Sequence, residues 1–149
     1  MNKGGTVTPI GPNIKITMVH AEHSSELVWK DAAGKDNTYS AGEPVGFIIT
    51  LENGMKVYHM GDTGLFGDMK LIGDYYKPDI ILMPIGGHFV MPPEDAAYAT
   101  KNWLHPKHVI PMHYGTFPPL KGTPDEYKAA LGASSTQVHA LKPGEEISF

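Results

Sequence analysis

Two short apolar runs with a helix-like segment between them constrain the fold of this chain most strongly. Residues 79–84 (DIILMP) and 108–112 (HVIPM) are almost continuously apolar, which is typical of strands covered on both faces. Between them, residues 93–104 (PEDAAYATKNWL) begin with Pro, Glu and Asp and continue with Ala, a pattern that favours a helix. Strands alternating with helices indicate a sheet with helices packed on it. We therefore expect an α/β fold, or a mixed α+β sheet.

Further strands and helices are expected on both sides of this unit. Residues 45–51 and 56–60 predict a hairpin, because Asn53-Gly54 between them is a strong turn signal. Other patterns predict strands over residues 6–8, 14–20, 137–141 and 146–149, and helices over residues 65–76 and 124–131, the latter with Thr123 as N-cap. The polar residues 24–44 are expected to form a long connection in which Trp29 and Tyr39 pack down as part of a lid.

Length and composition exclude several classes of protein. With 149 residues and 41% hydrophobic residues the chain is of globular type and has the usual size of one domain. No apolar run approaches the ~20 residues that cross a bilayer, so no membrane association is expected. The net charge of −4 makes nucleic acid a poor candidate for a partner.

Cysteine is absent, which excludes disulfides, thiolate metal sites and cysteine nucleophiles. The first residues, MNKGGTVTPIGP, lack the apolar stretch of a secretory signal. We therefore expect a cytoplasmic protein. Eight histidines in such a chain indicate imidazole chemistry, with oxygen atoms as further ligands.

Ionisable side chains follow three of the expected strands directly. His23 follows the strand at residues 14–20, Asp62 follows residues 56–60, and His113 follows residues 108–112. Side chains at strand ends can converge on one point, and imidazole and carboxylate ligands suit Zn²⁺, Mn²⁺ or Fe²⁺. Each residue also has a simpler interpretation. His23 is then a surface or capping residue, Asp62 a turn residue bonded to its own backbone, and His113 a hydrogen-bonded strand-end residue.

Three longer motifs carry a resemblance to a known family. They are residues 60–64 (MGDTG), 83–87 (MPIGG) and 111–118 (PMHYGTFP). His-Ser-Ser at residues 23–25 and residues 66–73 (FGDMKLIG) and 93–97 (PEDAA) extend the match to nearly the whole chain. With these motifs the chain resembles the second half of a metallo-β-lactamase-fold protein, and in particular the metal-dependent hydrolases related to ascorbate-6-phosphate lactonase. The implied fold is the C-terminal half of an αββα sandwich.

The resemblance implies a set of metal ligands. The third ligand motif of the family is a His, which matches His23. The fourth is an Asp that bridges two metals, which matches Asp62, and the fifth is a His, which matches His113. Asp62 and His113 are thus the implied catalytic residues, and the implied cofactor is a divalent metal, with Zn²⁺ preferred over Mn²⁺ or Fe²⁺.

The remaining histidines receive other interpretations. His88 resembles a position near the family's substrate pocket, although it also fits a simple loop histidine, and Tyr114 and Thr116 are the other candidates for substrate contact. The others match no ligand motif and are interpreted as structural (His20, His59) or as surface and packing residues (His105, His108, His139).

One departure from the family is clear. Its main metal motif, His-x-His-x-Asp-His, does not occur in this chain. Residues 1–149 are therefore interpreted as a single partial domain that lacks the N-terminal half. Loss of that half is expected to expose apolar strand surface, which a second copy of the chain or a complementary N-terminal half would cover.

Two functions follow from these observations. In the first, the protein is a hydrolase in which a metal-activated water attacks a lactone, ester or phosphoester, that is, a small-molecule substrate. In the second, it is a non-catalytic truncated or split fragment that needs a partner half to complete the metal site. A nucleic-acid processing module is a weaker possibility, because the chain is acidic and has no basic stripe.

Overall fold

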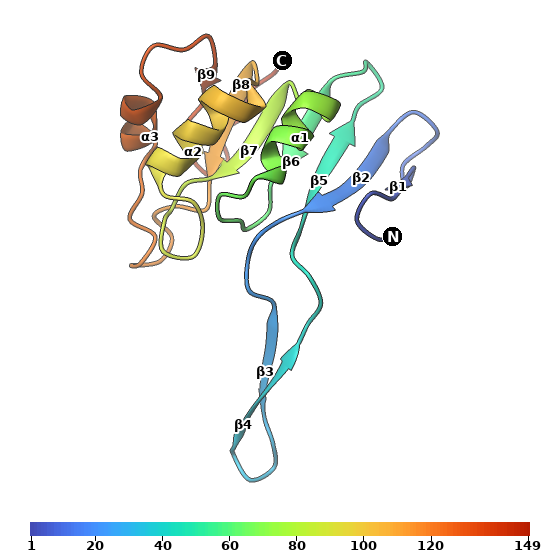
Figure 1. Cartoon of the computed structure of the whole chain (residues 1–149), viewed down its shortest axis with the longest axis vertical. Helices are drawn as coiled ribbons and strands as arrows, with labels where there is room; N and C mark the ends of the chain where they lie inside the picture. Colours follow the sequence, from blue (N-terminus) through green and yellow to red (C-terminus); the bar gives the residue numbers. More distant parts are fainter.

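A seven-stranded sheet forms the centre of the molecule in the computed structural model, which describes residues 1–149 (Figure 1). Its strands are β1 (Thr6–Val7), β2 (Lys15–His20), β5 (Val45–Thr50), β6 (Lys56–His59), β7 (Ile80–Pro84), β8 (His108–Met112) and β9 (Gln137–Val138), in the order β1-β2-β5-β6-β7-β8-β9. The pairs from β1 to β6 are antiparallel, and those from β6 to β9 are parallel. The sheet is therefore mixed, and the expected fold class is confirmed.

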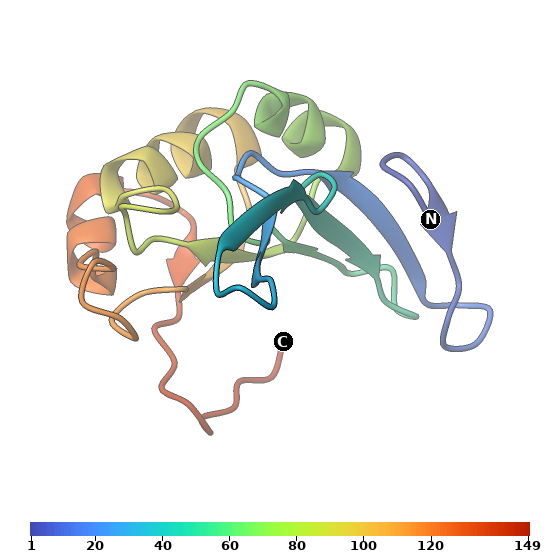
Figure 2. The same cartoon turned by 90° about the horizontal axis from the view of Figure 1, so that it is seen from below.

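The helices lie on one face of this sheet (Figure 2). They are α1 (Asp68–Tyr76), α2 (Pro93–Ala99), which continues as the π-helical turn η1 (Thr100–Leu104), and α3 (Pro124–Leu131). The predicted N-cap of α3 is confirmed, because the Thr123 side chain accepts a hydrogen bond from the backbone N–H of Glu126 while the Glu126 carboxylate bonds the backbone of Thr123. None of the helices is long and apolar enough to cross a membrane.

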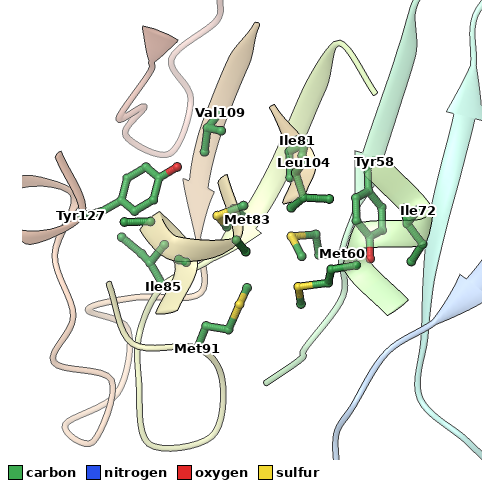
Figure 3. Close-up of a cluster of buried hydrophobic side chains, with 14 of the residues drawn as sticks. Tyr58, Met60, Ile72, Ile81, Met83, Ile85, Met91, Leu104, Val109 and Tyr127 are labelled. Atoms are coloured by element: carbon green, nitrogen blue, oxygen red, sulfur yellow. The ribbon is translucent and has the colours of Figure 1, made fainter. Parts of the chain in front are cut away.

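The hydrophobic core lies between the sheet and the helices (Figure 3). Alternate residues of the central strands point toward the helices, so that Tyr58, Ile81 and Val109 lie side by side in the register and are fully buried. Met60, Met69, Met83 and Met91 fill the space beside them. The continuous apolar run of β7 is explained by this arrangement, since four of its five residues are buried.

The opposite face of the sheet has no helical cover (Figure 2). The register places a row of apolar side chains there. Ile80 among them is buried, but five of its neighbours are only half-buried: Phe47, Ile49, Val57, Leu82 and Ile110. We call these five residues the open sheet face. Near one end of it, Phe149 of the C-terminal segment packs against the ring of His108, with a centroid distance of 4.5 Å. Exposed apolar strand surface was expected from the sequence, and the side chains of this face are half-buried.

The connection expected over residues 24–44 is instead a second hairpin, which corrects the sequence-based prediction. β3 (Glu26–Lys30) and β4 (Asp36–Ser40) pair antiparallel and project from the body of the molecule (Figure 1). Trp29 and Tyr39 do not pack down as a lid, because they stack on each other and remain 46% and 55% exposed. The turn forms because the Asp31 side chain accepts hydrogen bonds from the backbone N–H groups of Ala33 and Lys35. The hairpin was not predicted because its strands are short and are flanked by polar turn residues.

Other differences lie at element ends. The strand predicted over residues 146–149 does not form, and the one over residues 137–141 is limited to β9. The helix predicted from Leu65 begins at Asp68. The predicted hairpin at Asn53-Gly54 is confirmed, with the Asn53 side chain accepting a hydrogen bond from the backbone N–H of Met55.

Candidate functional site

The chemistry-bearing residues gather at one edge of the sheet because four strands run in the same direction. β2 is antiparallel to β5, and β5 is antiparallel to β6, so β2 runs parallel to β6, β7 and β8. Their carboxyl ends therefore share one edge. The segments that follow them carry His23, Asp62, His88 and His113 in turn. This placement agrees with the sequence-based expectation for ligand-binding edges of such sheets.

Asp62 and His113 meet at this edge. The Oδ2 atom of Asp62 lies 3.3 Å from Nε2 of His113, and the two side chains are 51% and 30% exposed. His113 follows β8 with a φ of +55°, a left-handed conformation that turns its ring out of the strand direction. On the other side of the ring, Nδ1 is buried and has no hydrogen-bond partner. An imidazole and a carboxylate thus face each other at a solvent-accessible point.

The loop that carries Asp62 is fastened to neighbouring segments through Thr63. The Thr63 hydroxyl accepts a hydrogen bond from the backbone N–H of Glu22 (2.9 Å) and donates one to the carbonyl of Gly64 (2.8 Å). The Thr63 carbonyl accepts a third from the backbone N–H of Met91 (3.0 Å). Thr63 is completely buried. These contacts hold the position of Asp62 relative to β2 and to the loop after β7.

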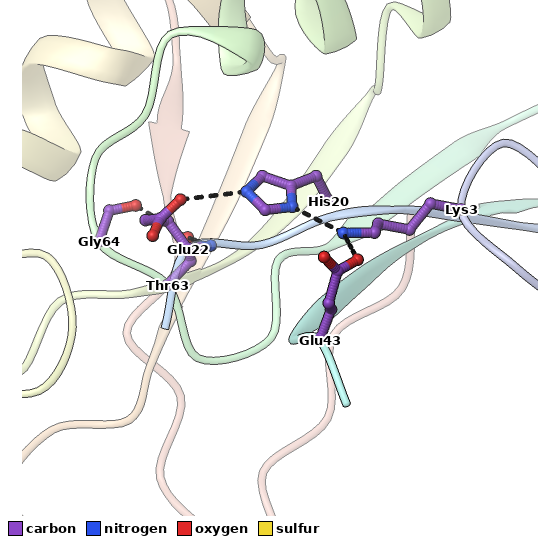
Figure 4. A network of polar contacts seen from close by, with 6 residues as sticks. All are labelled: Lys3, His20, Glu22, Glu43, Thr63 and Gly64. Atoms are coloured by element: carbon purple, nitrogen blue, oxygen red, sulfur yellow. Dashed lines mark hydrogen bonds and ion pairs between the residues drawn. The ribbon is translucent and has the colours of Figure 1, made fainter. Parts of the chain in front are cut away.

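A network of charged residues continues from this loop toward the base of the β3–β4 hairpin, which we call the hairpin arm (residues 26–40; Figure 4). His20 lies between Lys3 and Glu22, with Nδ1 3.2 Å from Lys3 Nζ and Nε2 3.2 Å from the Glu22 carboxylate. Lys3 also forms an ion pair with Glu43. The hydrogen bond and the charge of Lys3 lower the pKa of the Glu43 carboxyl group. His20 therefore participates in a polar network that ties the N-terminal segment to β2, and this fits its structural interpretation.

His23 does not join the Asp62–His113 pair. Its Nδ1 lies 2.7 Å from the carbonyl oxygen of Ser24, and the chain contains no group of three His, Asp or Glu residues arranged to hold a metal ion. The structure therefore brings together two of the three residues implied as ligands.

The implied substrate-contact residues surround the site edge. His88 is exposed, has a φ of +60°, and packs edge-on against Phe89 at 4.3 Å. Tyr114 is half-buried against the core, and Thr116 is exposed. A groove of about 650 Å³ lies beside His88 and is lined by Gly, Pro and charged residues.

Two features of this edge were not predicted from the sequence. One is Thr63, because a Gly-Asp-Thr-Gly turn pattern does not predict that the threonine is buried. The other is the stack of Phe89 on Phe117, with ring centroids 5.9 Å apart and planes 7° from parallel. Both rings are about half exposed. Exposed phenylalanines in two loops can be noticed in the sequence, but only the fold shows that their rings lie together.

The donor atoms present fit part of a divalent-metal site. Imidazole nitrogen and carboxylate oxygen are ligands of Zn²⁺, and a metal-bound histidine ordinarily donates its second ring N–H to a hydrogen-bond acceptor. His113 offers Nε2 toward Asp62, but its buried Nδ1 has no such acceptor. Catalytic zinc sites usually have three protein ligands. Asp62 and His113 can therefore supply two of them, and the unpaired Nδ1 indicates that the environment of His113 is incomplete.

Comparison with known proteins agrees with this fold. Residues 1–114 match the family model described as "Beta-lactamase superfamily domain". A UPF0173 metal-dependent hydrolase from Polaromonas sp. (strain JS666) is 64% identical over 149 residues, which cover 99% of this chain and 54% of that protein. This chain thus spans about half the length of the curated relatives that it matches.

Solved structures give the same result. The metallo hydrolase Igni18 from Ignicoccus hospitalis superposes with a TM-score of 0.84 at 40% identity, covering 100% of this chain and 59% of that one. A Thermotoga maritima protein of the metallo-β-lactamase superfamily, at 22% identity, shares the fold with a TM-score of 0.62, covering 93% of this chain and 69% of that one. The fold is therefore that of the metallo-β-lactamases, and the chain belongs to the β-lactamase superfamily domain family.

Proposed function

We propose that this chain supplies the Asp62–His113 part of a divalent-metal site in a hydrolase whose substrate is a small lactone, ester or phosphoester. The observation that carries the proposal is the 3.3 Å approach of Asp62 Oδ2 to His113 Nε2, from segments that follow two parallel strands. The names of the relatives, which are metal-dependent hydrolases, support the same reaction class.

The proposed ligands are His23, Asp62 and His113, with Zn²⁺ as the preferred metal and Mn²⁺ or Fe²⁺ as alternatives. A metal bound there supplies Lewis-acid polarisation of the scissile group and lowers the pKa of water. Because the His23 ring now lies against the Ser24 carbonyl, its participation requires a rotation of that side chain. His88, Tyr114 and Thr116 are the proposed contacts for the substrate, since their segments border the same edge.

The open sheet face supports a second part of the proposal, which concerns partners. Five half-buried apolar side chains on one face of a sheet are commonly covered in a complete protein. We propose that a complementary N-terminal half, or a second copy of the chain, covers this face. The alternative function, a non-catalytic fragment that becomes active only with that half, rests on the same observation and on the two-ligand site.

Zinc binding by the full chain tests the proposal. The wild type is stripped with a chelator, titrated with Zn²⁺ and analysed for bound metal by mass spectrometry. We expect about one zinc per chain, and an affinity that falls by about tenfold or more in Asp62→Asn and in His113→Asn. Asparagine is chosen at position 113 because it tolerates the left-handed backbone there.

His105→Asn is the matched control, since His105 is an exposed histidine with a φ of +46°. Equal zinc binding by all four proteins contradicts the assignment of Asp62 and His113. To test the alternative, the chain is co-expressed with the remaining half of the Polaromonas relative. Hydrolysis of lactone or phosphoester panels only in that complex, and its loss in His113→Asn, supports the fragment interpretation.

A further inference from the structure

Two phenylalanine rings stack on each other at the edge of the sheet that carries Asp62 and His113. The ring centroids of Phe89 and Phe117, which we call the aromatic pair, lie 5.9 Å apart, and the ring planes are 7° from parallel. The ring of His88 packs edge-on against Phe89, with a centroid distance of 4.3 Å. Phe89 and Phe117 nevertheless remain 47% and 51% exposed. The aromatic pair therefore presents apolar surface to solvent.

The loop that carries Phe89 is tied to the loop that carries Asp62. Met91, two residues after Phe89, donates its backbone N–H to the carbonyl of Thr63 (3.0 Å), the residue after Asp62. Within the same loop, the backbone N–H of Phe89 donates to the carbonyl of Gly87 (2.7 Å), which makes a tight turn. Backbone contacts therefore hold the segment of Phe89 close to Asp62.

The loop that carries Phe117 begins at His113. Phe117 is four residues further along the chain, so the two Cα atoms are at most about 14 Å apart. The loop before it lies close by, because a Cβ atom at Gly86 would be 2.2 Å from the carbonyl oxygen of His113. Figure 1 and Figure 2 both show the loops after β7 and β8 side by side. A small molecule at Asp62 and His113 can therefore extend to the aromatic pair.

The size of this apolar surface decides which kind of partner it suits. An aromatic side chain carries about 150–250 Å² of surface, so two half-exposed rings offer about 200 Å² together. A specific protein interface takes about 800 Å² from each partner. The adjoining groove adds no large apolar side chain, since Gly, Pro, His, Glu and Lys residues line it. Its volume of about 650 Å³ lies within the range of small-molecule sites. The surface thus fits a small molecule better than a protein.

We propose that the aromatic pair binds an aromatic or other planar apolar group of the substrate, beside the bond that is hydrolysed at Asp62 and His113. This inference rests on the proposed hydrolase function and narrows its substrate class to lactones, esters or phosphoesters that carry such a group. The group packs on the outer surface of the pair. Insertion between two parallel rings needs roughly 7–8 Å, twice the contact distance of two carbon atoms, whereas the centroids are 5.9 Å apart.

Binding of two lactones to the full chain tests the proposal without requiring turnover. γ-Phenyl-γ-butyrolactone carries the aromatic group, and γ-butyrolactone lacks it. Each is titrated into the chain with and without Zn²⁺, and backbone amide shifts measured by NMR give the dissociation constant. We expect the wild type to bind the phenyl lactone about tenfold more tightly than the plain lactone. Phe89→Leu and Phe117→Leu should each reduce this preference by about three- to tenfold.

Two further variants serve as controls. Tyr98→Leu removes an aromatic ring of similar exposure, 48%, from helix α2. Phe117→Tyr keeps a ring at the proposed contact. Both variants should retain the preference for the phenyl lactone within about twofold. Circular dichroism verifies that every variant is folded.

No detectable binding of the phenyl lactone by the wild type, or equal affinity for the two lactones, overturns the proposal. So does a preference that survives both leucine variants. A dimer that dissociates in Phe89→Leu and Phe117→Leu also overturns it, because the rings would then lie between two copies of the chain. Failure of the hydrolase function is read separately, from zinc binding at Asp62 and His113. A chain that binds no zinc but keeps the preference refutes the metal assignment and supports the aromatic site.

Discussion

The hydroxyl of Thr63 lies 2.9 Å from the backbone nitrogen of Glu22 and accepts its hydrogen bond, which joins the loop after β6 to the segment after β2. Since Asp62 is the preceding residue, this contact bears on the candidate site directly. The hydroxyl also donates to the carbonyl of Gly64, so both of its hydrogen-bonding functions are satisfied in a fully buried position. Such a residue is sensitive to loss of the hydroxyl.

We expect Thr63→Val to lower the free energy of unfolding by about 1–3 kcal/mol, because the partly buried hydrogen bonds to the backbone groups of Glu22 and Gly64 are lost. Thr63→Ser keeps the hydroxyl and should cost clearly less. Urea denaturation of both variants measures the difference. In the zinc titration described above, Thr63→Ser should also retain higher affinity than Thr63→Val. Equal stability of the two variants would show that the hydroxyl is unimportant.

Replacement by phenylalanine should affect the stability of the protein differently at two buried tyrosines. The Tyr127 hydroxyl lies 2.7 Å from the Thr100 hydroxyl, whereas the Tyr58 hydroxyl is buried without any partner. Burial raises the pKa of Tyr127 to about 12 and raises that of Tyr58 further. We expect Tyr127→Phe to destabilise the protein by about 1 kcal/mol, and Tyr58→Phe to be neutral or stabilising. Thermal or urea unfolding of the pair is the test, and a larger loss in Tyr58→Phe would contradict it.

Gly73 allows α1 to pack closely on η1. A Cβ atom at this position would lie 2.1 Å from the carbonyl oxygen of Trp103, which is backbone and has little freedom to move. We therefore expect Gly73→Ala to destabilise the fold by about 1–3 kcal/mol or more through overpacking. Gly67→Ala is the control, because nothing lies within 4 Å of its Cβ position and its φ is −62°. Similar melting temperatures for the two variants would contradict this close approach.

The environment of His139 implies that the free energy of unfolding depends on pH. The pKa of His139 is lowered mainly by its partial burial, and the nearby His108 and Lys128 lower it further. The folded state therefore binds this proton less readily than the unfolded state does. The contribution of His139 to the free energy of unfolding is fully present above about pH 6.5, the pKa of a histidine in the unfolded chain. This contribution is lost as the pH falls through the lower pKa that His139 has in the folded state. We expect urea midpoints to decline from pH 7 to pH 5.

The matched variants for this pH dependence are His139→Gln and His105→Gln. Replacement of His139 removes the shifted group and should flatten the decline, whereas His105 is exposed and its replacement should leave the slope unchanged. An unchanged slope in His139→Gln would assign the acid sensitivity to other groups.

Much of the fold could be predicted from local patterns. The apolar runs of β7 and β8, the Asn53-Gly54 turn and the Thr123 cap each depend on residues that are neighbours in sequence, and all are present in the structure. The hairpin arm escaped prediction because its strands pack on nothing, so no buried alternation marks them. The isolated pattern of residues 146–149 suggested a strand, but no neighbouring strand pairs with it.

The sequence alone determined which residue types stand at the strand ends, because an apolar run followed by His or Asp is a local pattern. Only the tertiary structure decided which of them meet. Asp62 and His113 lie together because β6 and β8 run parallel with β7 between them, and because positive φ values at Gly61 and His113 turn both segments toward one point. His23 is not grouped with that pair, and its ring instead bonds the neighbouring Ser24 carbonyl. Distances across a sheet depend on register and on loop dihedrals, and neither is encoded by spacing along the chain.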